Sequence, residues 1–122
     1  MRRKPIVRIS KTVRPRFRVY HGTEIAIGPG KEDLLKAIFK TGSIHGAAEL
    51  MNMSYMRAWT LVRTMNACFR SPLVETVRGG RHRGGAWLTP MGKQVLELYL
   101  KLETDSLAAT KATWKAILRK LK

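Results

Sequence analysis

Two helical patterns that almost adjoin along the chain constrain the fold most strongly. Ser43 and Ser54 each stand immediately before an apolar helical stretch, at a position where a hydroxyl caps free backbone N–H groups. Only a short turn at Asn52 separates the two stretches, and asparagine tolerates the left-handed backbone conformation of tight turns. The sequence therefore predicts helices over 44–51 and 54–69, packed against each other as a helix-turn-helix.

A further helix is expected before this pair and a β-hairpin after it. The segment 28–30, Gly-Pro-Gly, is predicted to break the chain, and a helix is expected from residue 31 to Gly42. Its buried stripe is expected to contain Leu34, Leu35, Ile38 and Phe39. After Pro72, the segments 73–77 and 86–88 alternate like strands around a glycine-rich basic loop over 78–85. This order of elements is typical of a wing that follows a helix-turn-helix.

Alternating residues near the N-terminus predict a second β-hairpin. Phe17 and Val19 fall on one face of the first strand, and Ile25 and Ile27 alternate in the second, after a turn at 21–22. The first 20 residues hold eight basic side chains and no acidic one. Within them, residues 1–15 are expected to form a flexible basic arm.

A long helix is expected at the C-terminal end, over 89–122. Thr89 can cap it, and Pro90 suits its first position. A helix of about 30 residues is about 45 Å long, which exceeds what so small a core can cover. A second copy of the chain is the simplest partner that could bury the rest of this helix. A dimer interface is therefore predicted at an apolar seam of Val95, Leu98, Leu102, Ala109, Ala112 and Ala116.

These elements together define a fold class. The sequence predicts a mainly α protein with a small β component, a winged helix-turn-helix with an N-terminal β-hairpin and a long C-terminal dimerisation helix. Three regions follow: the basic arm over 1–15, the DNA-binding domain over 16–88 and the dimerisation helix over 89–122.

The charge of the chain limits its partners. Lysine and arginine number 24 against 8 acidic residues, a formal net charge of +16. Such a chain binds polyanions readily, because each phosphate that it neutralises releases condensed counterions. Nucleic acid is the first candidate partner, ahead of an anionic membrane surface or the ribosome. No apolar run approaches the ~20 residues that span a bilayer, so no membrane partner and a cytoplasmic location are expected.

The residues that enzymes and metal sites require are scarce. A single cysteine, Cys68, can form neither an internal disulfide nor a cysteine-based zinc site. No two of the three histidines lie four residues apart on a helix. No set of nucleophile, base and acid is evident. The sequence therefore predicts a protein that is not an enzyme and has no cofactor, no metal and no evident small-molecule effector.

The helix over 54–69 is the candidate recognition helix. At about 100° per residue, one side gathers an apolar face of Ala58, Val62, Met65 and Phe69. The opposite side of a recognition helix reads bases in the major groove. Base readout is expected at Arg57, Thr60 and Arg63, since arginine contacts guanine edges and threonine packs on thymine methyl groups.

Other side chains are expected to hold the DNA backbone. On and beside the two helices, this set comprises Ser43, Ser54 and Tyr55. In the wing, whose glycines allow a close approach to phosphates, it comprises Arg78, Arg81, His82 and Arg83. Met56 is also expected at the DNA surface, where it can make only apolar contacts. Trp59 lies on a flank of the helix, where it could wedge between helices or touch DNA.

Several short motifs carry a family resemblance. They are Gly42-Ser43-Ile44, Ala47-Ala48, Met53-Ser54-Tyr55, Ala58-Trp59, Met65-Asn66, Leu73-Val74-Glu75, the Gly-Gly-Arg…Gly-Gly-Ala wing and Leu88-Thr89-Pro90-Met91-Gly92. In this order they resemble the N-terminal DNA-binding domain of the ModE family, over about 27–102. The resemblance implies a LysR-like winged helix-turn-helix, a homodimer and regulation of transcription. The family's separate molybdate-binding domain has no counterpart in these 122 residues, so molybdate sensing is not expected of them.

Two alternatives to a site-specific regulator stay open. A nucleoid-type architectural protein binds DNA by charge and shape with little sequence preference, and the basic N-terminal region favours it. An adaptor would instead use its long helix to dock another protein, with DNA binding secondary.

Overall fold

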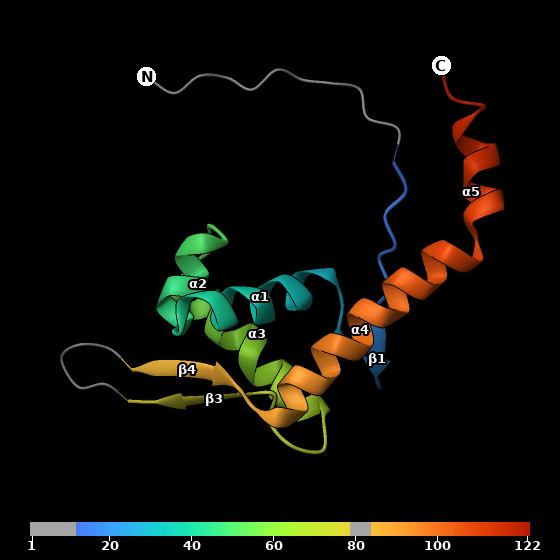
Figure 1. Cartoon of the computed structure of the whole chain (residues 1–122). Coiled ribbons are helices and arrows are strands. Elements are labelled where there is room, and N and C mark those ends of the chain that lie inside the picture. Colours follow the sequence, from blue (N-terminus) through green and yellow to red (C-terminus); the bar gives the residue numbers. More distant parts are fainter. Residues whose placement is uncertain (1–11, 79–83) are drawn as a thin grey trace, which may run out of the picture.

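The computed structural model describes residues 12–78 and 84–122. It is mainly helical with two small antiparallel hairpins (Figure 1), so the expected mainly α winged-helix fold with an N-terminal β-hairpin is confirmed. In chain order the elements are β1 Val19–His21, β2 Glu24–Ile27, α1 Pro29–Thr41, α2 Ile44–Leu50, α3 Tyr55–Cys68, β3 Val74–Val77, β4 Gly85–Leu88, α4 Pro90–Ala109 and α5 Lys111–Leu118. Most of the expected arm, residues 1–11, lies outside the described residues.

The helix-turn-helix forms as the capping residues predict. The Ser43 hydroxyl accepts a hydrogen bond of 2.8 Å from the Gly46 N–H at the start of α2. The Ser54 hydroxyl accepts one of 3.1 Å from the Arg57 N–H at the start of α3. Between them, Asn52 adopts a φ of 56°, the left-handed region expected for this turn.

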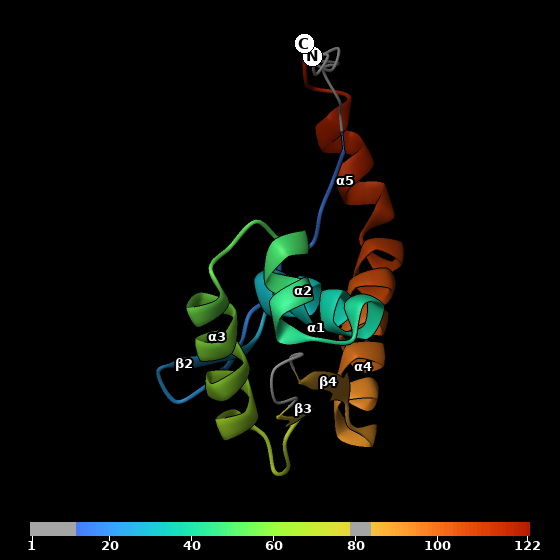
Figure 2. The ribbon, with the colours of Figure 1, turned by 90° about the vertical axis from the view of Figure 1, so that its left-hand side faces the viewer.

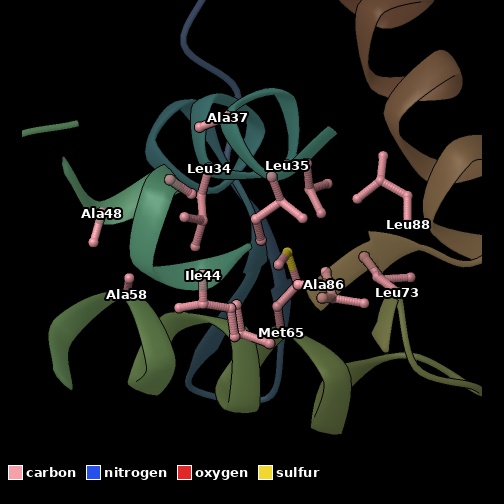
Figure 3. Close-up of a cluster of buried hydrophobic side chains, with 14 of the residues drawn as sticks. Leu34, Leu35, Ala37, Ile44, Ala48, Ala58, Met65, Leu73, Ala86 and Leu88 are labelled. Atoms are coloured by element: carbon pink, nitrogen blue, oxygen red, sulfur yellow. The ribbon is translucent and has the colours of Figure 1, made fainter. Parts of the chain in front are cut away.

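A single core lies between α1, α2, α3 and the wing strands. Figure 3 shows side chains from all of these elements converging on it: Leu34, Leu35, Ala37, Ile44, Ala48, Ala58, Met65, Leu73, Ala86 and Leu88. The alanines of α2 let this helix approach α1 and α3 closely. Complete burial of side chains such as Leu34 and Met65 stabilises the fold by about 2 kcal/mol each.

The wing is fixed to the helices by backbone hydrogen bonds. In β4, the Ala86 N–H donates to the Gly42 carbonyl in the turn between α1 and α2, at 2.8 Å. Strand β3 pairs with β4 from Val74 opposite Leu88 to Val77 opposite Gly85. The base of the wing is therefore held against the helix-turn-helix.

Two expectations for α1 are wrong. The helix begins at Pro29, because proline fits the first helical position and does not break the chain there. Phe39 is 69% exposed. Helical periodicity places it between Leu35 and Glu32, which are both buried, so this side of α1 becomes exposed only in the last turn of the helix.

The expected continuous C-terminal helix is also wrong, because it breaks at Thr110. There φ is −106° and ψ is 13°, which separates α4 from α5. The Thr110 hydroxyl donates to the Ser106 carbonyl at 2.7 Å, a back-bond that bends helices. The Trp114 indole N–H donates to the Leu107 carbonyl at 2.9 Å and so satisfies an acceptor at the end of α4. In both views α5 extends away from the core (Figures 1 and 2).

Buried polar groups hold the first half of α4 against the N-terminal region. The Tyr99 hydroxyl donates to the Phe17 carbonyl at 2.6 Å. Burial raises the pKa of Tyr99, and the charges of Glu103 and Glu32 raise it further, so this donor keeps its proton. Burial also raises the pKa of Glu103. A hydrogen bond to Glu32 and the negative charge of Glu32 raise this pKa further.

Replacing Glu103 with glutamine is expected to stabilise the protein at neutral pH. An acid whose pKa folding raises holds its proton more tightly in the folded state, so its ionisation destabilises the fold. The neutral E103Q side chain avoids this cost, and we expect a gain of about 0.5 kcal/mol for this partly exposed group. The gain should vanish below the ordinary pKa of 4.5, where the proton is bound in both states.

Thermal unfolding across this pH range measures the effect. E97Q is the matched control, because Glu97 lies on the exposed side of α4. An equal gain in E97Q, or a gain in E103Q that persists at pH 4, would contradict the explanation.

Candidate nucleic-acid interface

Helix α3 presents the predicted polar face to solvent. Its buried residues are Ala58, Val62 and Met65, as the periodicity predicts, and Phe69 is half-buried. Met56 is 66% exposed and Tyr55 49%. The three predicted base-reading side chains are also exposed: Arg57, Thr60 and Arg63. A helix with such a face is free to enter a major groove about 12 Å wide.

A hollow of about 520 Å³ lies between α3 and the wing. It is lined by Ser43, Ile44, His45, Tyr55, Trp59, Thr76, Val77, Arg78, Gly84 and Gly85. Three of the predicted contact residues, Ser43, Tyr55 and Arg78, thus come together from separate elements. Trp59 is half-buried and packs against the core while lining this hollow, in agreement with a wedge between elements.

Of the predicted wing residues, the structure describes only Arg78, which directly follows β3 and is exposed. Arg81, His82 and Arg83 lie outside the described residues. Their expected contact with the DNA backbone stays a prediction.

A second hollow, of about 300 Å³, lies on the opposite flank of α3. Figure 2 shows α3 with the β1–β2 hairpin on one side and the wing strands on the other. Four cations line this second hollow: Arg16, Arg18, Lys31 and Arg57. The periodicity of α3 places Arg57 on a flank, but the sequence offers no signal that arginines about 40 positions upstream lie beside it.

The predicted dimer seam remains largely open to solvent. Leu98 is 65% exposed and Leu102 is 38% exposed. Ala109 and Ala112 are exposed, and Ala116 is half-buried. Val95 differs, because it packs partly against the core of its own chain.

Other site types find little support within 12–78 and 84–122. Across those residues, no group of three histidine, cysteine or acidic side chains is placed to hold a metal ion. Over the same ranges, no helix is both long and apolar enough to cross a membrane.

The chain is similar to curated proteins named as molybdenum transport proteins, molybdenum-pterin-binding proteins and transcriptional regulators. It is 43% identical over 72 residues to the molybdenum transport protein ModE of Azotobacter vinelandii, covering 59% of this chain and 27% of that protein. It is 39% identical over 85 residues to the molybdenum-pterin-binding protein MopB of Rhodobacter capsulatus, covering 70% of this chain and 32% of that protein. No family model matches the chain.

A third relative has a name that states an activity. The chain is 39% identical over 71 residues to the DNA-binding transcriptional dual regulator ModE of Escherichia coli K12. Its relatives are thus ModE and Mop proteins. The chain spans about three tenths of the length of these relatives, so the similarity concerns one region of each.

Proposed function

We propose that this chain is a DNA-binding transcriptional regulator of the ModE kind that recognises specific sites in double-stranded DNA and is not an enzyme. The observation that carries the proposal is the exposed polar face of α3, set between the wing and a cationic hollow. The net charge of +16 supplies the attraction to phosphates. The name of the Escherichia coli relative supports the same activity.

In the proposed complex, α3 lies in the major groove and the wing contacts the adjacent backbone. Thr60 and Arg63 face base edges from the exposed side of the helix, because bases are read by side chains on that side. Tyr55 and Ser43, at the mouth of the wing-side hollow, hold phosphates. Arg81, His82 and Arg83 extend the same role along the wing.

We infer that the functional unit is a homodimer joined through α4 and α5. Support comes from large apolar side chains that one chain leaves open: Leu98, Leu102, Ile117 and Leu121. Exposed apolar side chains of this size suit burial in a partner. Two-fold symmetry then predicts an inverted repeat with half-sites about one helical turn apart.

Arg63→Ala tests base readout. If Arg63 is bidentate to a guanine, we expect the variant to lose about 1–3 kcal/mol, roughly 5- to 150-fold in affinity, on the preferred site only. Selection from a pool of random duplexes identifies that site, and fluorescence anisotropy then measures affinity for the site and for an unrelated duplex. Lys93→Ala is the control, since Lys93 is exposed in the first turn of α4, before the predicted dimer seam.

The outcomes separate the candidate functions. An equal loss on both duplexes would make Arg63 a phosphate contact. Recovery of every sequence equally in the selection would instead establish an architectural protein, which the charge alone also favours.

A further inference from the structure

The hollow between α3 and the N-terminal hairpin concentrates positive charge on the flank of α3 that faces away from the wing. Arg16 and Arg18 reach it from the segment entering β1, Lys31 from the first turn of α1, and Arg57 from the first turn of α3. None of the side chains lining it is acidic. We call these four residues the hairpin clamp. Arg57, which the sequence predicted to read bases, is thereby assigned to the DNA backbone.

Lys31 occupies an unusual environment for a cation. It is only 9% exposed, and its ammonium donates to the Ile25 carbonyl. Among the described residues it forms no ion pair, although Lys36, one turn later, pairs with Glu32 at 3.1 Å. A buried charge without a counter-ion is costly. The cost rises at a helix N-terminus, where the positive end of the dipole repels cations and attracts anions.

The same place offers backbone donors. Gly28 is the N-cap of α1, and no side chain caps this end of the helix. The first N–H groups of a helix have no partner within it, and because Pro29 has no N–H, these groups here are those of Gly30 and Lys31. Gly30 is exposed, and a Cβ there would meet nothing within 4 Å. Cations, free N–H groups and a recess of about 300 Å³ together suit a phosphate group.

The geometry points to a DNA backbone phosphate as the ligand of the hairpin clamp, an inference that rests on the proposed function. A helix in the major groove has one phosphate backbone on each side. The wing lies beside one flank of α3 and the clamp lies beside the other. The clamp therefore holds the strand that the wing does not reach, and it fixes the depth and rotation of α3 in the groove.

The test compares R16A/R18A with wild type, R16K/R18K and a control that removes two exposed cations elsewhere, K93A/K122A, in the first turn of α4 and at residue 122. Affinity for a selected duplex and an unrelated one is measured by anisotropy across a salt series. Because each lost phosphate contact lowers the salt slope by about 0.9, R16A/R18A should lower it by about two per bound chain. It should weaken binding to both duplexes on the order of tenfold near 0.2 M salt.

R16K/R18K should keep most of the slope, and K93A/K122A should match wild type. Thermal unfolding checks that every variant folds. An unchanged slope in R16A/R18A, or a loss confined to the selected duplex, would overturn the clamp while leaving the proposed function intact. Failure of wild type to bind any duplex would overturn both. Saturable binding of inorganic phosphate to wild type, abolished in R16A/R18A, with unaltered DNA affinity, would assign the clamp to a free anion instead.

Discussion

Gly92→Ala is expected to destabilise the protein by about 3 kcal/mol or more, a large part of the ~5–15 kcal/mol that holds a typical domain folded. A Cβ at Gly92 would lie 2.1 Å from the Leu73 carbonyl oxygen and 3.0 Å from its carbonyl carbon. Because the obstacle is backbone, no rotamer change relieves it. Gly92 lies close to Leu73 because a hydrogen bond joins the start of α4 to the residue before β3. In it, the Thr89 N–H donates to the Leu73 carbonyl at 2.9 Å.

The Thr89 side chain tightens the same junction. Its hydroxyl donates to the Pro72 carbonyl at 2.7 Å and accepts from the Gly92 N–H at 2.9 Å. An added methyl group must therefore push the first turn of α4 away from β3 or break this cap. Either movement displaces the wing, which depends on β3.

Gly30→Ala is the matched control. Gly30 also lies in the first turn of a helix, but a Cβ there meets nothing within 4 Å. Alanine is about 1 kcal/mol better than glycine inside a helix, so this variant should be as stable as wild type or slightly more so. Urea unfolding monitored by circular dichroism measures both variants. Equal stability of G92A and wild type would mean that the junction is looser than these distances indicate.

The fold was largely predictable because its local signals are strong and agree. Ser43 and Ser54 mark the helix starts, Asn52 marks the turn, and the core face of α3 follows from a period of 3.6 residues. These features act between near neighbours, where capping and periodicity decide the structure.

The errors arise where the deciding contact is distant or subtle. The break at Thr110 depends on the hydrogen bond from the Thr110 hydroxyl and on that from the Trp114 indole. No proline or glycine marks the break in the sequence. The exposure of Phe39 depends on how far along α1 the other elements cover the side that it shares with Leu35 and Glu32.

The candidate site was predictable only in part. The exposed face of α3 follows from periodicity, whereas its two flanking hollows arise from long-range packing. Arg16 and Arg57 are 41 positions apart in the sequence, so only the fold places them around one hollow. Their role on DNA, like that of Arg63, stays a prediction.

Asn66→Ala is the second substitution with a large expected effect, a loss of about 2–4 kcal/mol. The Asn66 side chain accepts from the Leu73 N–H at 2.8 Å and the Val74 N–H at 3.1 Å. It also donates to the Val74 carbonyl at 3.0 Å. Leu73 and Val74 are buried, so alanine would leave their backbone groups without partners at about 1 kcal/mol or more each.

Amide hydrogen exchange separates this cause from a general loss of packing. In N66A, the Leu73 and Val74 amides should lose more protection than amides elsewhere in the core. Gln94→Ala is the control, because it removes an amide side chain from the exposed side of α4 and should change stability by no more than about 0.5 kcal/mol. Uniform loss of protection across the core in N66A would contradict the local explanation.

The position of Asn66 gives this prediction a functional consequence. Asn66 lies on α3, and its partners lie at the start of β3, so one side chain joins the candidate recognition helix to the wing. If α3 and the wing bind DNA as one unit, N66A should weaken binding to selected and unrelated duplexes alike, because the wing loses its fixed position relative to α3. R63A, by contrast, should act on the selected duplex alone. A folded N66A variant with wild-type affinity for both duplexes would mean that α3 and the wing bind DNA independently.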